Sequence, residues 1–231
     1  FYPEQELALR AQLGQLTSSL QAPLLFGAPR LNKTGADAHY YNSAYLLSPT
    51  GAVLDVYDKI RLLPFAEYRP FVLPQFLSHN AESPTEFTAG RRFTIFSLPQ
   101  NSFGVTICYE ATYPSLSRRL VHEGAQFLVN ISNDTWLTSP GDAAAAQHFS
   151  MTIFRAVENK RTLVRAATAG VSGFVDPVGR PIALSSQAEG ALIEHVTPQH
   201  EQTIYTQYGD WFPISCIGIV LLTLIVERRQ S

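Results

Sequence analysis

The sequence predicts an α/β layered sandwich in a single domain, followed by an apolar C-terminal helix. Two patterns predict the sandwich. Pairs of short apolar segments around Pro, Gly and Asn turns dominate the first half, and helical and strand-like segments alternate in the second half. An uncharged run at residues 211–226 predicts the terminal helix. The length of 231 residues fits one large domain, which we place at residues 1–210.

The first elements are expected to be a helix and a strand hairpin. Leucines at roughly helical spacing predict an amphipathic helix that covers a sheet: Leu7, Leu9, Leu13, Leu16 and Leu20. Pro23 should end this helix. Residues 24–28 then read as a short buried strand, and residues 40–48 and 52–57 as a hairpin around a Pro-Thr-Gly turn.

The remaining elements alternate in type, which indicates strands covered by helices. In chain order we expect strands at 93–98 and 103–108, a helix at 115–123, a strand at 127–131, a helix at 143–159, and strands at 163–167, 172–176 and 191–196.

Composition excludes several classes of protein. Charged residues make up 16% of the chain, below the ~25% of an ordinary globular domain. A net charge of −2 without a long basic block gives no electrostatic footprint for nucleic acid. Two cysteines cannot build a disulfide framework, and no ligand spacing predicts a metal site. We therefore expect no nucleic-acid partner, no metal and no cofactor.

The C-terminal apolar run permits two interpretations. A short apolar run is commonly a buried core helix, but residues 214–226 are apolar on nearly every face, and Trp211 and Phe212 could anchor at a membrane interface. We therefore predict a transmembrane helix at residues 211–227. The arginines behind it would make residues 228–231 a cytoplasmic tail and leave the domain outside.

Cys108 is a candidate nucleophile. It ends a predicted strand, where a turning chain exposes the sulfur to a cleft and points the next backbone N–H at the group under attack. A lone cysteine in an apolar strand is more often a small buried hydrophobe. A reactive thiolate needs a nearby cation and a carboxylate. Lys59, followed by Glu67, could supply them, although a lysine after a strand is by default a solvated surface charge.

Further motifs follow one another in a fixed order: Tyr57-Asp58-Lys59, Leu63 to Tyr68, Ile107-Cys108-Tyr109-Glu110, Asn130 to Trp136, Gln147-His148-Phe149, Arg155 to Asn159 and Arg165 to Ser172. In this order they resemble the nitrilase, or carbon–nitrogen hydrolase, superfamily, and within it most closely the apolipoprotein N-acyltransferases. The resemblance implies a four-layer α-β-β-α sandwich on the periplasmic side of a bacterial cell inner (cytoplasmic) membrane.

The resemblance also implies a reaction and its residues. The family passes an acyl chain from a phospholipid, through a cysteine thioester, to the α-amine of the diacylglyceryl-cysteine of an apolipoprotein. Cys108 would be the nucleophile and Lys59 would stabilise the oxyanion together with the Tyr109 backbone N–H. The catalytic set also includes the carboxylates Glu67 and Glu110, which would orient Lys59. The side chains of Tyr109 and Trp136 would line the substrate cleft.

One family residue lacks a clear match. The general-base glutamate stands in a Pro-Glu pair that ends a strand, whereas Glu4 stands at the start of a predicted helix. We therefore expect the base upstream of Phe1. A soluble amidase using water as second nucleophile and a non-catalytic module that binds lipoproteins remain alternatives.

The other chemistry-bearing residues have structural interpretations. We expect His148 to bind a loop carbonyl rather than to shuttle protons, and Cys216 to be a packing residue. Arg155, Glu158 and Arg165 are expected to form an ion-pair network. A Pro-rich stretch at residues 71–88 is where we expect a gate.

Overall fold

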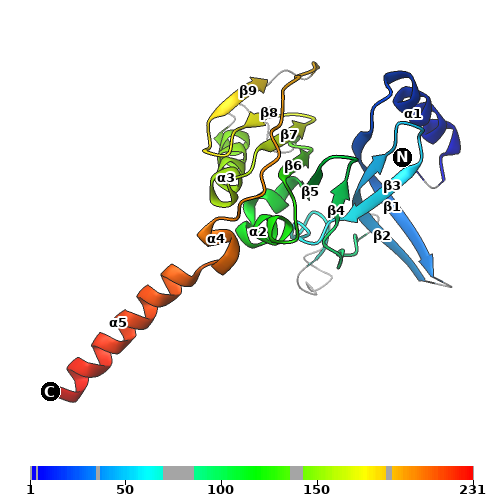
Figure 1. The fold of residues 1–231 in the computed structure, drawn as a ribbon. Helices are drawn as coiled ribbons and strands as arrows, with labels where there is room; N and C mark the ends of the chain where they lie inside the picture. The colour runs from blue at the N-terminus through cyan, green and yellow to red at the C-terminus, as the bar shows by residue number, and fades with distance from the viewer. Residues whose placement is uncertain are drawn as a thin grey trace.

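The computed structural model describes residues 2–3, 5–34, 37–69, 86–135, 143–185 and 189–230. The first half forms helix α1 (Leu7–Leu20) and an antiparallel three-stranded sheet of β1 (Leu24–Thr34), β2 (Asp37–Leu47) and β3 (Val53–Asp58) (Figure 1).

The second half forms a six-stranded sheet with the order β4-β5-β6-β7-β8-β9. Its strands are β4 (Ile95–Ser97), β5 (Ser102–Ile107), β6 (Phe127–Ser132), β7 (Leu163–Ala167), β8 (Ser172–Val175) and β9 (Pro181–Ser185). The strands β5, β6 and β7 run parallel, and the outer pairs are antiparallel. The helices of this half are the 3-10 helix η2 (Cys108–Thr112), α2 (Pro114–His122), α3 (Ala143–Asn159), α4 (Ile204–Tyr208) and α5 (Trp211–Gln230).

Two apolar clusters define three of the four layers, and α1 supplies the fourth. One fills the space between the sheets with side chains of β2 to β6, including Leu46, Phe96 and Val129. The other packs α2 and α3 on the outer face of the larger sheet, through residues such as Leu120 and Leu163. Helix α1 lies against the smaller sheet (Figure 1). The predicted α-β-β-α sandwich is therefore confirmed.

Alternation along β6 explains how one strand serves two layers. Val129 belongs to the cluster between the sheets, whereas Leu128 belongs to the cluster beneath the helices. Successive side chains of a strand point to opposite faces. Asn130 therefore lies on the helix side and Ile131 on the side of the other sheet, where the strand ends.

Most of the expected elements are present, and one is wrong. The predicted helices at 7–20 and 143–159, the hairpin and the strand at 163–167 agree with the structure. Residues 191–196 form no strand, and the edge strand is β9 instead. Asp176 explains the difference: its carboxylate accepts the backbone N–H groups of Val178 and Arg180, and this turn returns the chain along β8 at once.

The C-terminal helix α5 extends away from the sandwich (Figure 1). Its segment Trp211–Arg228 is long and apolar enough to cross a membrane, and none of it is buried against the described residues. Within the described residues, α5 is therefore not a buried core helix. Arginine side chains tie the preceding segment to the domain: Arg118 donates to the carbonyls of Tyr205 and Gln207, and Arg161 donates to that of Glu201.

Candidate active site

A cavity of about 910 Å³ lies between the two sheets. One wall comes from β1 and includes Gly27, and the other comes from the carboxyl ends of the parallel strands β5, β6 and β7. Ligands of open α/β sheets characteristically bind outside these strand ends. Lys59, Glu67 and Cys108 all line the cavity, so three of the residues singled out in the sequence come together.

The backbone at Cys108 turns this residue out of the strand pattern. Along β5, Phe103 and Ile107 belong to the cluster between the sheets, whereas a Cβ on Gly104 would meet a leucine of α2 at 2.8 Å. Continued alternation would send Cys108 to the helix side. Instead, Cys108 has a left-handed φ of 52° and lines the cavity. This conformation costs a residue with a Cβ about 1–2 kcal/mol, and such strain clusters at functional sites.

Lys59 is held in one place from three sides. Its ammonium nitrogen Nζ donates to both carboxylate oxygens of Glu67, at 2.9 and 2.7 Å. Its backbone N–H donates to the carbonyl of Asn42, and its own carbonyl accepts the N–H of Gly90, each at 2.8 Å. The side chain is only 1% exposed. The interpretation of Lys59 as a solvated surface charge is therefore wrong.

Glu67 is saturated with donors. Besides Lys59, it accepts the side-chain amide of Asn42 at 2.8 Å and the backbone N–H of Leu63 at 2.7 Å. A carboxylate bound by this many donors is fixed in orientation. Glu67 therefore holds the ammonium group of Lys59 at the cavity wall. Asn42, which the sequence did not single out, completes this arrangement.

Glu110 connects the lysine segment to the cysteine segment. Its fully buried carboxylate accepts the hydroxyl of Tyr57 and the backbone N–H groups of Ile60, Arg61 and Ile107, at 2.7 to 2.9 Å. Burial raises the pKa of Glu110, although the hydrogen bonds from these donors oppose it. Because the bonded groups flank Lys59 and Cys108, Glu110 fixes the two segments against each other. It does not line the cavity.

The structure does not place either of the two side chains expected in the substrate cleft, Tyr109 and Trp136, at the cavity. The ring of Tyr109 is not among the groups that line the cavity, and it packs edge-on against Tyr113 with ring centroids 5.3 Å apart. The Tyr109 ring therefore lies away from this cavity, and its place in a substrate cleft stays a prediction. Trp136 lies outside the described residues, as do Glu4 and residues 71–85 of the expected gate.

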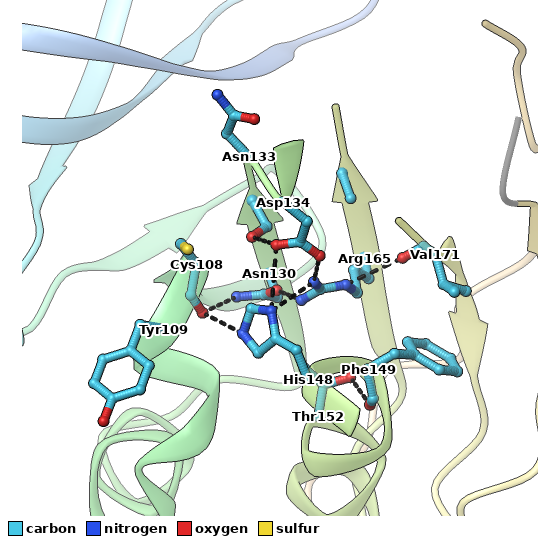
Figure 2. Close-up of polar contacts among 12 residues, drawn as sticks. Cys108, Tyr109, Asn130, Asn133, Asp134, His148, Phe149, Thr152, Arg165 and Val171 are labelled. Carbon is cyan, nitrogen blue, oxygen red and sulfur yellow. Dashed lines mark hydrogen bonds and ion pairs between the residues drawn. The ribbon is translucent and has the colours of Figure 1, made fainter. Parts of the chain in front are cut away.

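A buried polar network lies behind Cys108 (Figure 2). Arg165 of β7 donates to Asp134 at 2.5 Å and also to the side-chain oxygen of Asn130. Nδ1 of His148, on α3, lies 3.2 Å from Asp134. Burial alone would raise the pKa of Asp134, but hydrogen bonds from His148 and a neighbouring serine, together with the charge of Arg165, lower it to about 2. Asp134 is therefore a firmly ionised partner of Arg165.

His148 has the structural contact expected of it. Its Nε2 lies 3.3 Å from the backbone carbonyl of Cys108. The expected three-residue ion-pair network divides in two, because Arg155 pairs with Glu158 at 2.7 Å while Arg165 pairs with Asp134. Within the described ranges, no group of three or more His, Cys, Asp or Glu side chains could hold a metal ion.

Comparison with known families and proteins agrees with this geometry. Residues 2–205 match the carbon-nitrogen hydrolase family. The chain is 34% identical to an apolipoprotein N-acyltransferase of Geobacter metallireducens, over 100% of this chain and 44% of that protein. It is 34% identical to apolipoprotein N-acyltransferase 2 of Treponema denticola, over 90% of this chain and 41% of that protein. The chain thus spans less than half the length of these relatives.

Solved structures share the fold. An amidase from Nesterenkonia sp. superposes with a TM-score of 0.62 at 22% identity, over 89% of this chain and 70% of the amidase. A carbon-nitrogen hydrolase from Helicobacter pylori superposes with a TM-score of 0.61 at 18% identity, over 79% of this chain and 64% of that protein. At these identities the likeness concerns the fold alone.

Proposed function

Because the chain belongs to the carbon-nitrogen hydrolase family, we propose that it is the catalytic part of an apolipoprotein N-acyltransferase that works through Cys108. The single observation that carries the proposal is the strained turn that sets Cys108 into the same cavity as the buried Lys59–Glu67 pair. The names of the relatives support the transfer of an acyl group to a nitrogen of an apolipoprotein. The proposal further takes a phospholipid as the acyl donor and a diacylglyceryl apolipoprotein as the acceptor.

The reaction has two covalent steps. First, the Cys108 thiolate attacks the ester carbonyl of a phospholipid; a C–S bond forms, the ester C–O bond breaks, and the lysophospholipid alcohol leaves with a proton. Then the α-amine of the acceptor attacks the thioester; a C–N bond forms, the C–S bond breaks, and the amine proton passes to a base. This is ping-pong covalent catalysis, and a cavity of about 910 Å³ can admit an acyl chain.

Each of the two steps passes through an oxyanion that needs donors. The Lys59 ammonium and the Tyr109 backbone N–H are the donors in this proposal, and preorganised donors of this kind commonly supply the largest catalytic term. Glu67 and Glu110 act as positioning residues, the first through the ammonium group of Lys59 and the second through the backbone around it. Trp136 is proposed as a cleft residue.

The proton transfers need a general base. The sequence expectation puts that base outside residues 1–231, with Glu4 as the alternative. Glu4→Gln in the whole protein decides between them. Unchanged acylation of Cys108 supports a base elsewhere, whereas loss of acylation assigns the role to Glu4.

We propose that α5 anchors the domain in the inner membrane. Residues 1–210 would form the catalytic domain on the periplasmic side, residues 211–227 the transmembrane helix and residues 228–231 the cytoplasmic tail. Trp211 at one end and the arginines at the other are typical of the two membrane interfaces. A membrane position also brings the cavity close to a phospholipid donor.

A thioester test decides the function. The whole protein in detergent micelles is incubated with a phospholipid, and its peptides are examined by mass spectrometry. We expect an acyl group on Cys108 that hydroxylamine removes, no such group in Cys108→Ala, and an unchanged group in the matched variant Cys216→Ala. Acyl groups that persist in Cys108→Ala would refute the assignment.

Three further measurements separate the rival functions from the transferase: ammonia release from small amides, hydrolysis of the thioester, and retention of a lipoprotein on a column. An amidase would release ammonia from small amides and would use water to clear the thioester without a lipoprotein acceptor. A binding module would retain a lipidated lipoprotein on a column and show no acyl group on any residue. Either result contradicts the transferase proposal.

A further inference from the structure

The carbonyl oxygen of Cys108 lies inside the protein while its sulfur lies at the cavity. Nδ2 of Asn130 and Nε2 of His148 both approach this oxygen at 3.3 Å. Figure 2 shows the carbonyl turned into the buried network and the sulfur turned away from it. One peptide unit, the one joining Cys108 to Tyr109, is therefore held from behind by two side chains.

A peptide held by its carbonyl has a fixed N–H direction. The described chain contains no cis peptide bonds, and in a trans peptide the C=O and N–H bonds point in opposite directions. With its carbonyl bound to Asn130 and His148, this peptide must direct the Tyr109 N–H away from the network, toward the side on which the sulfur lies. That N–H is the backbone donor of the proposed oxyanion hole.

The chemistry of His148 is consistent with permanent donation. The carbonyl oxygen can only accept, so the contact at Nε2 requires a hydrogen on that nitrogen. The other nitrogen, Nδ1, lies 3.2 Å from both Asp134 and Arg165. A neutral ring accepts there from Arg165, and a charged ring donates there to Asp134. In both forms Nε2 carries its hydrogen.

The network is built to keep the two donors in place. Nδ2 of Asn130 also lies 3.0 and 3.1 Å from the hydroxyl and carbonyl oxygens of Thr106, so its two hydrogens are shared among three acceptors, and the Asn130 side-chain oxygen accepts from Arg165. The exposed fraction of Asn130 and Asp134 is 0%, and that of His148 is 7%. Side chains that are buried and bonded on every side cannot rotate away from the peptide without leaving buried groups unpaired.

We propose that Asn130 and His148, fixed by Asp134 and Arg165, are positioning residues that clamp the Cys108–Tyr109 peptide and thereby aim the Tyr109 N–H at the reaction oxyanion. The inference rests on the proposed acyl transfer through Cys108 and adds a role for the network behind it. The clamp also polarises the peptide, because a carbonyl that accepts hydrogen bonds makes the N–H of the same unit a stronger donor.

The test compares two reactions of the same sulfur. p-Nitrophenyl butyrate acylates a thiolate through a tetrahedral oxyanion: the C–S bond forms, the ester C–O bond breaks and p-nitrophenolate leaves. Iodoacetamide alkylates a thiolate by displacement of iodide, without an oxyanion. A variant that disturbs only the oxyanion hole therefore slows the first reaction and leaves the second unchanged.

His148→Asn and His148→Gln form the decisive pair, measured in the whole protein in micelles. Glutamine reaches as far as Nε2 and can still donate to the Cys108 carbonyl, whereas asparagine ends near Nδ1. We expect His148→Asn to slow acylation of Cys108 by about 10- to 100-fold, below the ~10²- to 10³-fold loss of a complete oxyanion donor. Alkylation should change less than about twofold, and His148→Gln should restore most of the acylation rate.

The matched control is Thr152→Val. Thr152 is fully buried on the same helix, and its hydroxyl donates to the carbonyl of Phe149. Its replacement should leave both rates unchanged. If His148→Asn does not fold, as judged by thermal unfolding, Asn130→Ser removes the other donor and should slow acylation about tenfold.

Three results overturn the clamp: equal slowing of acylation and alkylation, an unchanged acylation rate in a folded His148→Asn, or no recovery in His148→Gln. The proposed function can fail separately. A wild-type protein that p-nitrophenyl butyrate acylates but phospholipids do not would refute the phospholipid-dependent transferase while leaving the clamp intact.

Discussion

The Lys59–Glu67 pair makes stability and site geometry depend on the same contact. Glu67→Gln keeps the shape of the side chain and removes its charge. The side chain of Lys59 is 1% exposed and that of Glu67 is 12% exposed, so the ammonium is left buried without a counter-charge. Breaking a buried pair in this way costs about 3–5 kcal/mol. Because Glu67 retains slight exposure and its amide can still accept one hydrogen bond, we expect the lower end, about 3 kcal/mol.

Pulse proteolysis in urea measures this cost on the whole protein in micelles, since it counts the folded domain directly. Lys59→Met and the double variant complete a double-mutant cycle, in which we expect a coupling of about 2 kcal/mol. The matched control is Glu123→Gln, which breaks the exposed Arg119–Glu123 pair and should cost less than about 0.5 kcal/mol. A Glu67→Gln protein that unfolds at the wild-type urea concentration would refute the argument from burial.

Three further predictions follow from single contacts. In Gly90→Ala, the new Cβ would lie 2.1 Å from the carbonyl oxygen of Asp58. We therefore expect the free energy of unfolding, measured by pulse proteolysis, to fall by about 1–3 kcal/mol and acylation of Cys108 to slow. Wild-type stability and rate would contradict the close approach. Cys108→Gly should be more stable than Cys108→Ala by about 1 kcal/mol, because glycine tolerates the left-handed backbone; the opposite order would refute strain. Asp134 has a folded pKa of about 2 against an ordinary 3.8. Its ionised carboxylate therefore contributes about 2 kcal/mol to the free energy of unfolding above pH 4, and this contribution is lost as the pH falls through 2. Urea unfolding of Asp134→Asn at a series of pH values should lack this pH-dependent loss.

Local sequence patterns predicted the layers because each depends on near neighbours. The helix at residues 7–20 and the strand at residues 127–131 are decided within a few residues, although the leucines that predicted the helix are largely exposed rather than packed on the sheet. The turn at Cys108 is different. Its position at the end of a predicted strand indicated an exposed sulfur, and the structure places Cys108 at the cavity. The bonds that its carbonyl makes to Asn130 on β6 and His148 on α3 join segments far apart in the chain, and no short-range pattern contains them.

The positions around Lys59 show a second limit. Asn42 is 17 positions away in the chain, yet the register of β2 with β3 pairs Ser43 with Asp58 and so brings Asn42 beside Lys59. Counting outward from the hairpin turn could have found this neighbour, but a bulge at Leu46/Leu47 shifts the register. Glu110 could not be assigned in this way, since its four donors come from separate segments.

The bonds of Glu110 fix the segments of Lys59 and Cys108 against each other, so little at these two positions can change the shape of the cavity. Gly27 of β1 is a different case. A Cβ at this position would stand 3.1 Å from the side chain of Ile131 on β6, and both residues line the cavity. Under the proposed acyl transfer, a residue larger than glycine at position 27 should therefore narrow the cavity and shorten the acyl chains accepted.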